Sequence, residues 1–365
     1  MIVEEVAGKK KERVTVYDWV RVIAMVYVVI GHSAYLDMQT NLGGVAYNLP
    51  VDLSPAYNSG ILSGIRWLAG WVYGFHMPLF FMLSGATIAL RQLGTFDNIL
   101  KSKVKRLLIP YFVYGWFFMF PIKRLGYFYD NASLKEALKA FLSGQESGHL
   151  WFLIALFWCI LVFVVIVKLI EKVNIKSIYA ILLITGIVQL LCPYIPFDIL
   201  GLKIGLSYIF YFALGYVFEK ERSKNSRWNL KTTISAGVLL LGLEIINVQY
   251  GVLDGFFTII VGAFFTYIMA ELCDRFFLRV PNTKAWNFII TNIFYVYLLH
   301  DPLNYIILRI FMSQNYLDSA IGCYMFTFFR TIVLFTVSLF GGAFVRFVKK
   351  KVNLILGKIA TEGRK

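Results

Sequence analysis

Long apolar segments follow one another through almost the whole chain. A helix needs about 20 mainly apolar residues to cross the hydrocarbon core of a bilayer, and about ten such runs can be marked. With 59% hydrophobic and 16% charged residues, the 365-residue chain is too apolar for a soluble domain. We therefore expect an all-α, polytopic integral membrane protein with about ten transmembrane helices. The expected spans are 15–36, 65–90, 106–120, 149–169, 177–195, 204–219, 232–249, 255–273, 286–308 and 321–347.

The basic residues predict the orientation of these spans. Most of the 36 Lys and Arg fall on one side when the N-terminus is placed in the cytoplasm. Because basic loops stay in the cytoplasm, both termini are expected there, with short tails at about 1–14 and 348–365. Residues 1–365 then form a single membrane-embedded domain. The net charge of +15 is mainly a topology signal in this interpretation, with binding to anionic lipid as the alternative and no nucleic acid expected.

The first apolar run carries a polar stripe. In YDWVRVIAMVYVVIGH, the spacings put Asp18, Arg21 and His32 within about 60° of one another on a helix, with His32 about 16 Å beyond Arg21. A lipid-facing helix has no need of a histidine at this depth, so His32 is a catalytic candidate together with Arg21 and Asp18. For Asp18 the alternative is a local ion pair with Arg21.

The other three histidines also fall in or beside apolar runs, where ionisable groups are costly and mark cavities or chemistry. His76 precedes Pro78 in FHMPLFFMLSG, His149 opens HLWFL, and His300 lies in YLLHDPL. We expect them to meet His32 in the outer half of the membrane. Candidates for the acceptor or oxyanion side are His76, His149, Trp151, His300, Ser84 and Glu244. Interfacial anchoring, close helix packing and helix pairing are the respective alternatives for Trp151, Ser84 and Glu244.

A basic loop follows the second expected span. Arg91, Lys105 and Arg106 lie on the predicted cytoplasmic side, where they could bind the phosphates of a nucleotide-containing donor. The alternative is that the loop only enforces topology. The four cysteines have no metal-ligand spacing, so no metal is expected.

These motifs, in this order, resemble acyltransferase family 3. The resemblance rests on Arg21 and His32, FHMPLFFMLSG, RLLIP, HLWFL and YLLHDP. It implies transfer of an acyl group, most often acetyl, from cytoplasmic acyl-coenzyme A to a hydroxyl of an extracytoplasmic glycan, with His32 as the catalytic histidine and Arg21 as its partner. One difference concerns the donor side, because many relatives have a second arginine shortly after the position of Arg91, and this chain reads Gln92, Leu93 and Gly94 there.

Imidazole is suited to deprotonating a sugar hydroxyl, so we expect His32 to act as a general base, with an acyl-histidine intermediate as the alternative. No permanently bound cofactor is expected. The expected partners are acyl-coenzyme A as co-substrate, the glycan, membrane lipids, and a homo-oligomer or biosynthetic complex, in a bacterial plasma membrane. Two other functions remain open: a transporter or flippase of a glycan or small polar solute, and a non-catalytic partner of a polysaccharide synthase.

Overall fold

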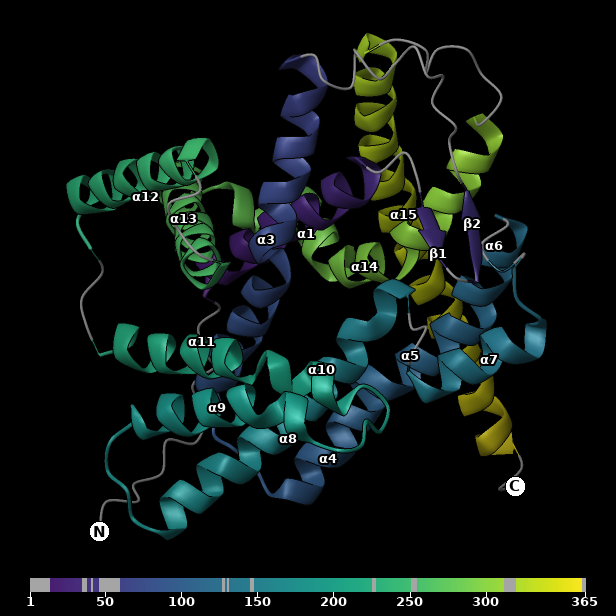
Figure 1. Cartoon of the computed structure of the whole chain (residues 1–365). Helices are drawn as coiled ribbons and strands as arrows, with labels where there is room; N and C mark the ends of the chain where they lie inside the picture. The colour runs from purple at the N-terminus through teal and green to yellow at the C-terminus, as the bar shows by residue number, and fades with distance from the viewer. Residues whose placement is uncertain are drawn as a thin grey trace.

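The computed structural model describes residues 14–34, 38–40, 42–45, 60–126, 129, 131–144, 148–224, 228–250, 255–311 and 320–362. Nearly all of the regular structure in these ranges is helical (Figure 1). The exception is an antiparallel hairpin of β1 (Met38–Thr40) and β2 (Gly43–Val45), in which Met38 pairs with Val45. Apart from this hairpin, the expected all-helical class is confirmed.

Long helices form most of the molecule, and shorter ones connect them. The long helices are α1 (Thr15–Ala34), α3 (Gly60–Ala89), α8 (Trp151–Lys172), α12 (Leu230–Tyr250), α13 (Gly255–Phe276), α14 (Lys284–Phe311) and α15 (Ala320–Glu362). The shorter ones are α4 (Phe96–Lys103), α5 (Ile109–Tyr114), α6 (Phe120–Leu125), α7 (Leu134–Ser143), α9 (Ala180–Leu191), α10 (Leu202–Ser207) and α11 (Ile209–Arg222).

Six stretches of the described residues are long and apolar enough to cross a membrane. They lie in α1, α3, the segment from α7 to α8, α12, α13 and α15. The expected count of about ten spans and the cytoplasmic placement of both termini stay predictions.

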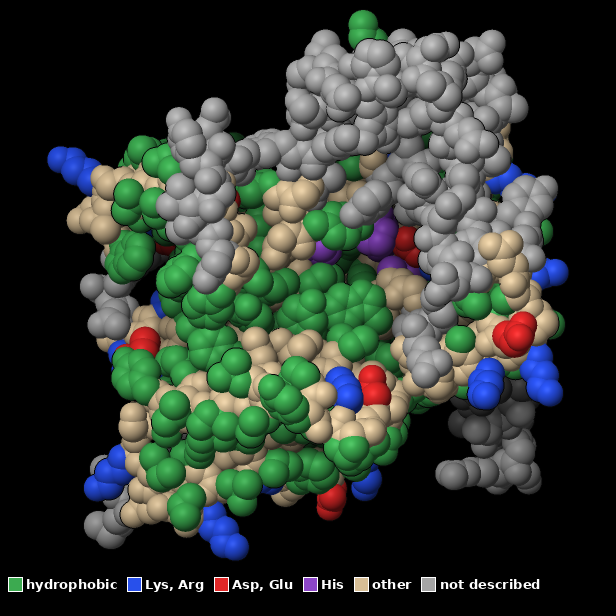
Figure 2. All heavy atoms as spheres, viewed as in Figure 1, with side chains coloured by type: hydrophobic (Ala, Val, Ile, Leu, Met, Phe, Trp, Pro, Cys, Tyr) green, Lys and Arg blue, Asp and Glu red, His purple; other side chains and the backbone are tan. Residues whose placement is uncertain are grey.

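Large apolar side chains remain exposed on several helices, as a lipid environment requires. Phe117 and Leu190 are each 75% exposed, and Phe344 is 67% exposed. Figure 2 shows hydrophobic side chains over much of the visible face. Soluble monomers rarely expose apolar patches of this extent, because burial in an apolar environment is favourable. The surface therefore indicates a protein surrounded by lipid.

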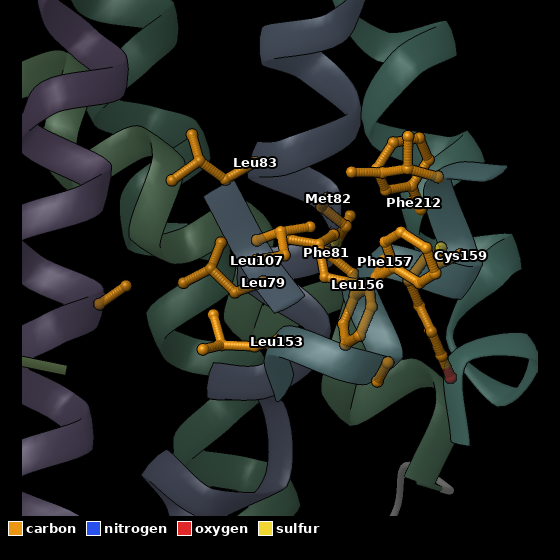
Figure 3. Close-up of a cluster of buried hydrophobic side chains, with 14 of the residues drawn as sticks. Leu79, Phe81, Met82, Leu83, Leu107, Leu153, Leu156, Phe157, Cys159 and Phe212 are labelled. Atoms are coloured by element: carbon orange, nitrogen blue, oxygen red, sulfur yellow. The ribbon is translucent and has the colours of Figure 1, made fainter. Parts of the chain in front are cut away.

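The backbones of α3 and α11 touch through two glycines. A Cβ built on Gly85 would lie 1.9 Å from the carbonyl oxygen of Phe212, and one on Gly215 would lie 1.9 Å from that of Met82. Small residues allow such close approach between membrane helices. Beside this contact, apolar side chains of α3 and α8 interdigitate (Figure 3). Gly85 is therefore a packing residue, which fixes α3 and the side chains that it carries.

Residues 96–125 form one helical stretch that contains two π-helical turns, Val104–Leu108 and Gly115–Met119. Each turn is followed closely by a proline, Pro110 or Pro121. Because proline has no N–H to donate, the usual hydrogen-bond ladder is interrupted and the stretch deforms. The expected third span, 106–120, is thus part of a longer, irregular stretch that carries Lys123 in its last turn.

We predict that Gly85→Ala destabilises the protein, because the added methyl group meets backbone rather than a movable side chain. The expected cost is about 1–3 kcal/mol, measured as a lower thermal unfolding temperature in detergent. Gly242→Ala is the matched control, since a Cβ there has nothing within 4 Å. Equal unfolding temperatures for the two variants would contradict the backbone contact.

Candidate active site

The C-terminal end of α1 is held by side chains from two other helices. The last carbonyl groups of a helix lack partners within it. Here the Asn304 amide of α14 donates to the His32 carbonyl at 2.9 Å, and Arg330 of α15 donates to the Ser33 carbonyl. Arg330, which is fully buried, also donates to the Asn304 side chain at 3.2 Å. These contacts fix the position of His32.

Asp301 is the centre of the polar cluster. Its Oδ1 accepts a hydrogen bond from His32 Nδ1 at 3.0 Å, and its Oδ2 lies 3.1 Å from Lys123 Nζ and 3.1 Å from His149 Nδ1. The Asp301 side chain is 5% exposed and that of Lys123 is 2% exposed. A buried charge is costly unless it is paired, and Lys123 supplies the opposite charge. One carboxylate thus joins α1, α6, α14 and the short helix that carries His149.

Pro302, within α14, leaves a backbone carbonyl free to accept a hydrogen bond from His149. A proline cannot donate to the carbonyl four residues earlier, so the Leu298 carbonyl loses its usual helical partner. His149 Nε2 donates to that carbonyl at 3.1 Å. In addition, the Tyr297 hydroxyl donates to the backbone carbonyl of His149 at 2.6 Å. Both the ring and the backbone of His149 are therefore held by α14.

The four histidines meet at one site, as the sequence predicts. The ring centroids of His32 and His300 are 4.9 Å apart, and those of His149 and His300 are 5.5 Å apart. Tyr73 connects His76 to the other three, because the centroid of its ring lies 4.8 Å from that of His76 and 5.9 Å from that of His32. Residues more than 260 positions apart in the sequence thus form one cluster.

Hydrogen bonds to the backbone determine which ring nitrogen carries the proton in His76 and in His300. Nδ1 of His76 donates to the Val72 carbonyl at 2.9 Å, and Nδ1 of His300 donates to the Val296 carbonyl at 2.8 Å. A neutral imidazole has one donor and one acceptor nitrogen, so Nε2 of each ring then carries the lone pair. The His76 ring, which lines the cavity, is set to accept a hydrogen bond from a bound hydroxyl, whereas Nε2 of His300 is buried.

His32 differs from the other three histidines in exposure, because each of those is buried. Its Nδ1–H donates to a carboxylate, which leaves Nε2 with the lone pair. Its side chain is 19% exposed, whereas that of His149 is 2% exposed. A histidine oriented by a carboxylate and open to a cavity has the arrangement of a general base.

A cavity of about 800 Å³ connects this cluster with Arg21. All four histidines line it, together with Lys123 and Asp301. Its middle section is apolar, and Arg21 lines it about 16 Å along α1 from His32. Histidine side chains, purple in Figure 2, are visible within a hollow of the face shown. The cavity can hold an elongated ligand with its reacting end at His32.

The remaining candidates divide between the cavity and its surroundings. Ser84 and Trp151 line the cavity, whereas Asp18 and Glu244 are not among its lining residues. Asp18 accepts a hydrogen bond from Arg21 at 2.9 Å, which is the local ion pair considered from the sequence. Glu244 accepts one from the Trp71 indole at 2.9 Å.

The basic loop flanks the Arg21 end of the cavity. Arg91, Lys105 and Arg106 are exposed, and Leu107, next to Arg106, lines the cavity. Burial together with the positive charges of Arg106 and Arg91 lowers the pKa of Lys103, so these cations share one patch. An anion in this patch would lie at the mouth of the cavity.

Neither Lys123 nor Asp301 is among the residues that the sequence predicts for the site. The available signal is that Asp301 adjoins His300 within an apolar run, whereas Lys123 looks like an ordinary loop charge. Within the described ranges, no group of three or more His, Cys, Asp and Glu side chains has the arrangement of a metal site.

Comparison with known proteins gives two matches. A family model described as an acyltransferase domain matches residues 15–346. Nodulation protein NolL of Sinorhizobium fredii (strain NBRC 101917 / NGR234) is 29% identical over 227 residues, which are 62% of this chain and 54% of that protein. The chain therefore spans about half the length of this relative. No solved structure matches the chain.

We predict that Lys123→Met destabilises the protein by about 3–5 kcal/mol, because it leaves the Asp301 carboxylate buried without its countercharge. Thermal unfolding in detergent measures the effect. The double variant Lys123→Met/Asp301→Asn removes both charges and is expected to recover most of the loss. A double variant as unstable as Lys123→Met alone would show that the two charges do not compensate each other.

Proposed function

The chain belongs to the acyltransferase family whose domain model it matches, and on that premise we propose that it is a membrane O-acyltransferase. The proposed reaction moves an acyl group, most often acetyl, from acyl-coenzyme A to a hydroxyl of an extracytoplasmic glycan. The observation that carries the proposal is the His32–Asp301 pair inside an 800 Å³ cavity that reaches Arg21. It provides a base at one end of an elongated site and cations at the other.

The chemistry follows from the ring nitrogens. Because Asp301 accepts from Nδ1–H, Nε2 of His32 is free to take the proton of the acceptor hydroxyl. The hydroxyl oxygen then attacks the thioester carbonyl, and a C–O bond forms. When the C–S bond breaks, the proton passes from His32 to the departing thiolate, which leaves as free coenzyme A. Asp301 and Lys123 stabilise the imidazolium that exists between these two steps and keep its orientation.

The donor enters from the Arg21 end in this proposal. Arg91, Lys105 and Arg106 bind its phosphates by charge-assisted hydrogen bonds. The pantetheine arm then lies along the apolar middle of the cavity, past Met25 and Leu83, and brings the thioester to His32. Arg21, within this path, is the partner that we assign to donor binding.

The acceptor occupies the opposite end. Nε2 of His76 accepts a hydrogen bond from a sugar hydroxyl, since Nδ1 of this ring is bonded to backbone. Trp151 and Tyr73 supply aromatic surface around the bound sugar. An acceptor on the far side of the membrane and a donor in the cytoplasm can then meet without either crossing the bilayer. A bacterial plasma membrane is the proposed location.

We predict that purified wild-type protein in nanodiscs binds acetyl-coenzyme A and slowly releases free coenzyme A. His32→Ala is expected to keep donor binding and lose turnover by about 10²–10⁴-fold, because the base is removed. Asp301→Asn is expected to lower turnover with little change in donor affinity, whereas Arg21→Ala weakens donor binding. Isothermal titration and thiol release measure the two properties.

Gly242→Ala serves as the control for these activity measurements, since its added methyl group has open space. Full turnover in His32→Ala would contradict the assignment of the base. If the protein bound no acyl-coenzyme A and instead moved a glycan across vesicles without covalent change, a transporter would replace the acyltransferase.

A further inference from the structure

A basic groove lies between α14 and α15. It has a volume of about 580 Å³. Arg346, Lys349 and Lys350 line it from α15, and Phe294 and Tyr295 line it from α14. In the part of the chain that the structure describes, no carboxylate is among its lining residues. The groove therefore combines positive charge with aromatic surface.

The three cations share one face of α15. Positions separated by three and four residues are neighbours on a helix, and like charges there repel one another. Arg346 has a neutral partner, the Asn292 side chain, 3.5 Å away. The next lysine, Lys351, belongs to a different environment, because its ammonium lies over the Phe347 ring at 5.7 Å. A bound anion would relieve the repulsion in the groove.

The groove adjoins the cavity along α14. Phe294 lines both, and Ile293, next to the Arg346 partner Asn292, also lines the cavity. Phe294 precedes Asp301 by seven residues, which is about 10 Å along α14. A ligand seated in the groove can thus extend along α14 to the reacting cluster.

We propose that this groove binds the 3′-phosphate and adenine of the donor coenzyme A, an assignment that rests on the proposed function above. Coenzyme A carries a diphosphate beside its pantetheine arm and a separate phosphate on the ribose. The patch around Arg106 adjoins Leu107 of the cavity wall and is placed for the diphosphate. The groove lies to the side of the cavity and is placed for the more distant 3′-phosphate.

The chemistry of the groove fits that end of the molecule. A phosphate monoester is dianionic, and Arg and Lys bind it through charge-assisted hydrogen bonds. Phe294 and Tyr295 provide rings against which an adenine can stack. The donor then has a separate binding region for each of its two phosphate groups.

The test compares acetyl-coenzyme A with its 3′-dephospho form, bound to wild type and to Lys349→Gln/Lys350→Gln in nanodiscs of zwitterionic lipid. Wild type is expected to bind acetyl-coenzyme A about tenfold more tightly than the dephospho form. The double variant is expected to bind acetyl-coenzyme A about tenfold more weakly than wild type does. Its affinity for the dephospho form is expected to equal that of wild type. Lys172→Gln/Lys176→Gln removes the same charge from exposed positions at the end of α8 and after it, and is expected to bind both donors normally.

Each other outcome overturns the assignment. Equal affinity of wild type for the two donors would show that the 3′-phosphate is not recognised. Equal weakening of both donors by the double variant would place a different part of the donor in the groove. If donor affinities did not change and the variant instead lost binding of anionic lipid in anionic nanodiscs, the groove would be a lipid site. Failure of wild type to bind either donor would refute the proposed function itself.

Discussion

The site depends on one buried carboxylate. Asp301 contacts His32, His149 and Lys123, which come from three separate parts of the chain. A carboxylate inside an apolar helix bundle is tolerated only with a countercharge and hydrogen-bond donors, so the surrounding elements are held in one arrangement. Pro302 adds to this arrangement, because it frees the Leu298 carbonyl for His149. The negative charge that makes Asp301 costly to bury is thus also what orients the His32 ring.

This arrangement gives the cavity two chemically different ends. The Asp301 end presents the ring nitrogens of the histidines, whereas the other end is lined by Arg21 and has the cations of η2 (Val104–Leu108) and α4 nearby. Between them the wall is apolar, which suits an uncharged acyl-pantetheine arm and excludes stray water from the thioester. The proposed transfer needs such a division, because a charged donor nucleotide stays at one membrane face while its acyl group reaches the other half.

Much of the site could be predicted from the sequence, because an ionisable group within a membrane span is costly and usually lines a cavity or takes part in chemistry. This criterion found His32, His76, His149 and His300, and the structure brings them together. The same criterion also points to Glu244, which does not line the cavity and instead accepts a hydrogen bond from Trp71. The sequence does not reveal which helix packs against the Glu244 side of α12. The same criterion does not find Lys123, because a lysine after the end of an expected span looks like an ordinary loop charge. The helical class is predictable from the apolar runs, whereas the hairpin and the π turns break the helical pattern without a periodic signal in the sequence.

The most direct test is an experimental structure of the protein in nanodiscs with a non-hydrolysable acetyl-coenzyme A analogue. If His32 is the base, we expect the analogue's carbonyl carbon to lie within van der Waals reach of His32 Nε2. We also expect His32 Nδ1 to remain bonded to Asp301 and the nucleotide to lie at the Arg21 end. An analogue bound away from the cavity, or with its carbonyl remote from His32, would contradict this assignment of the base.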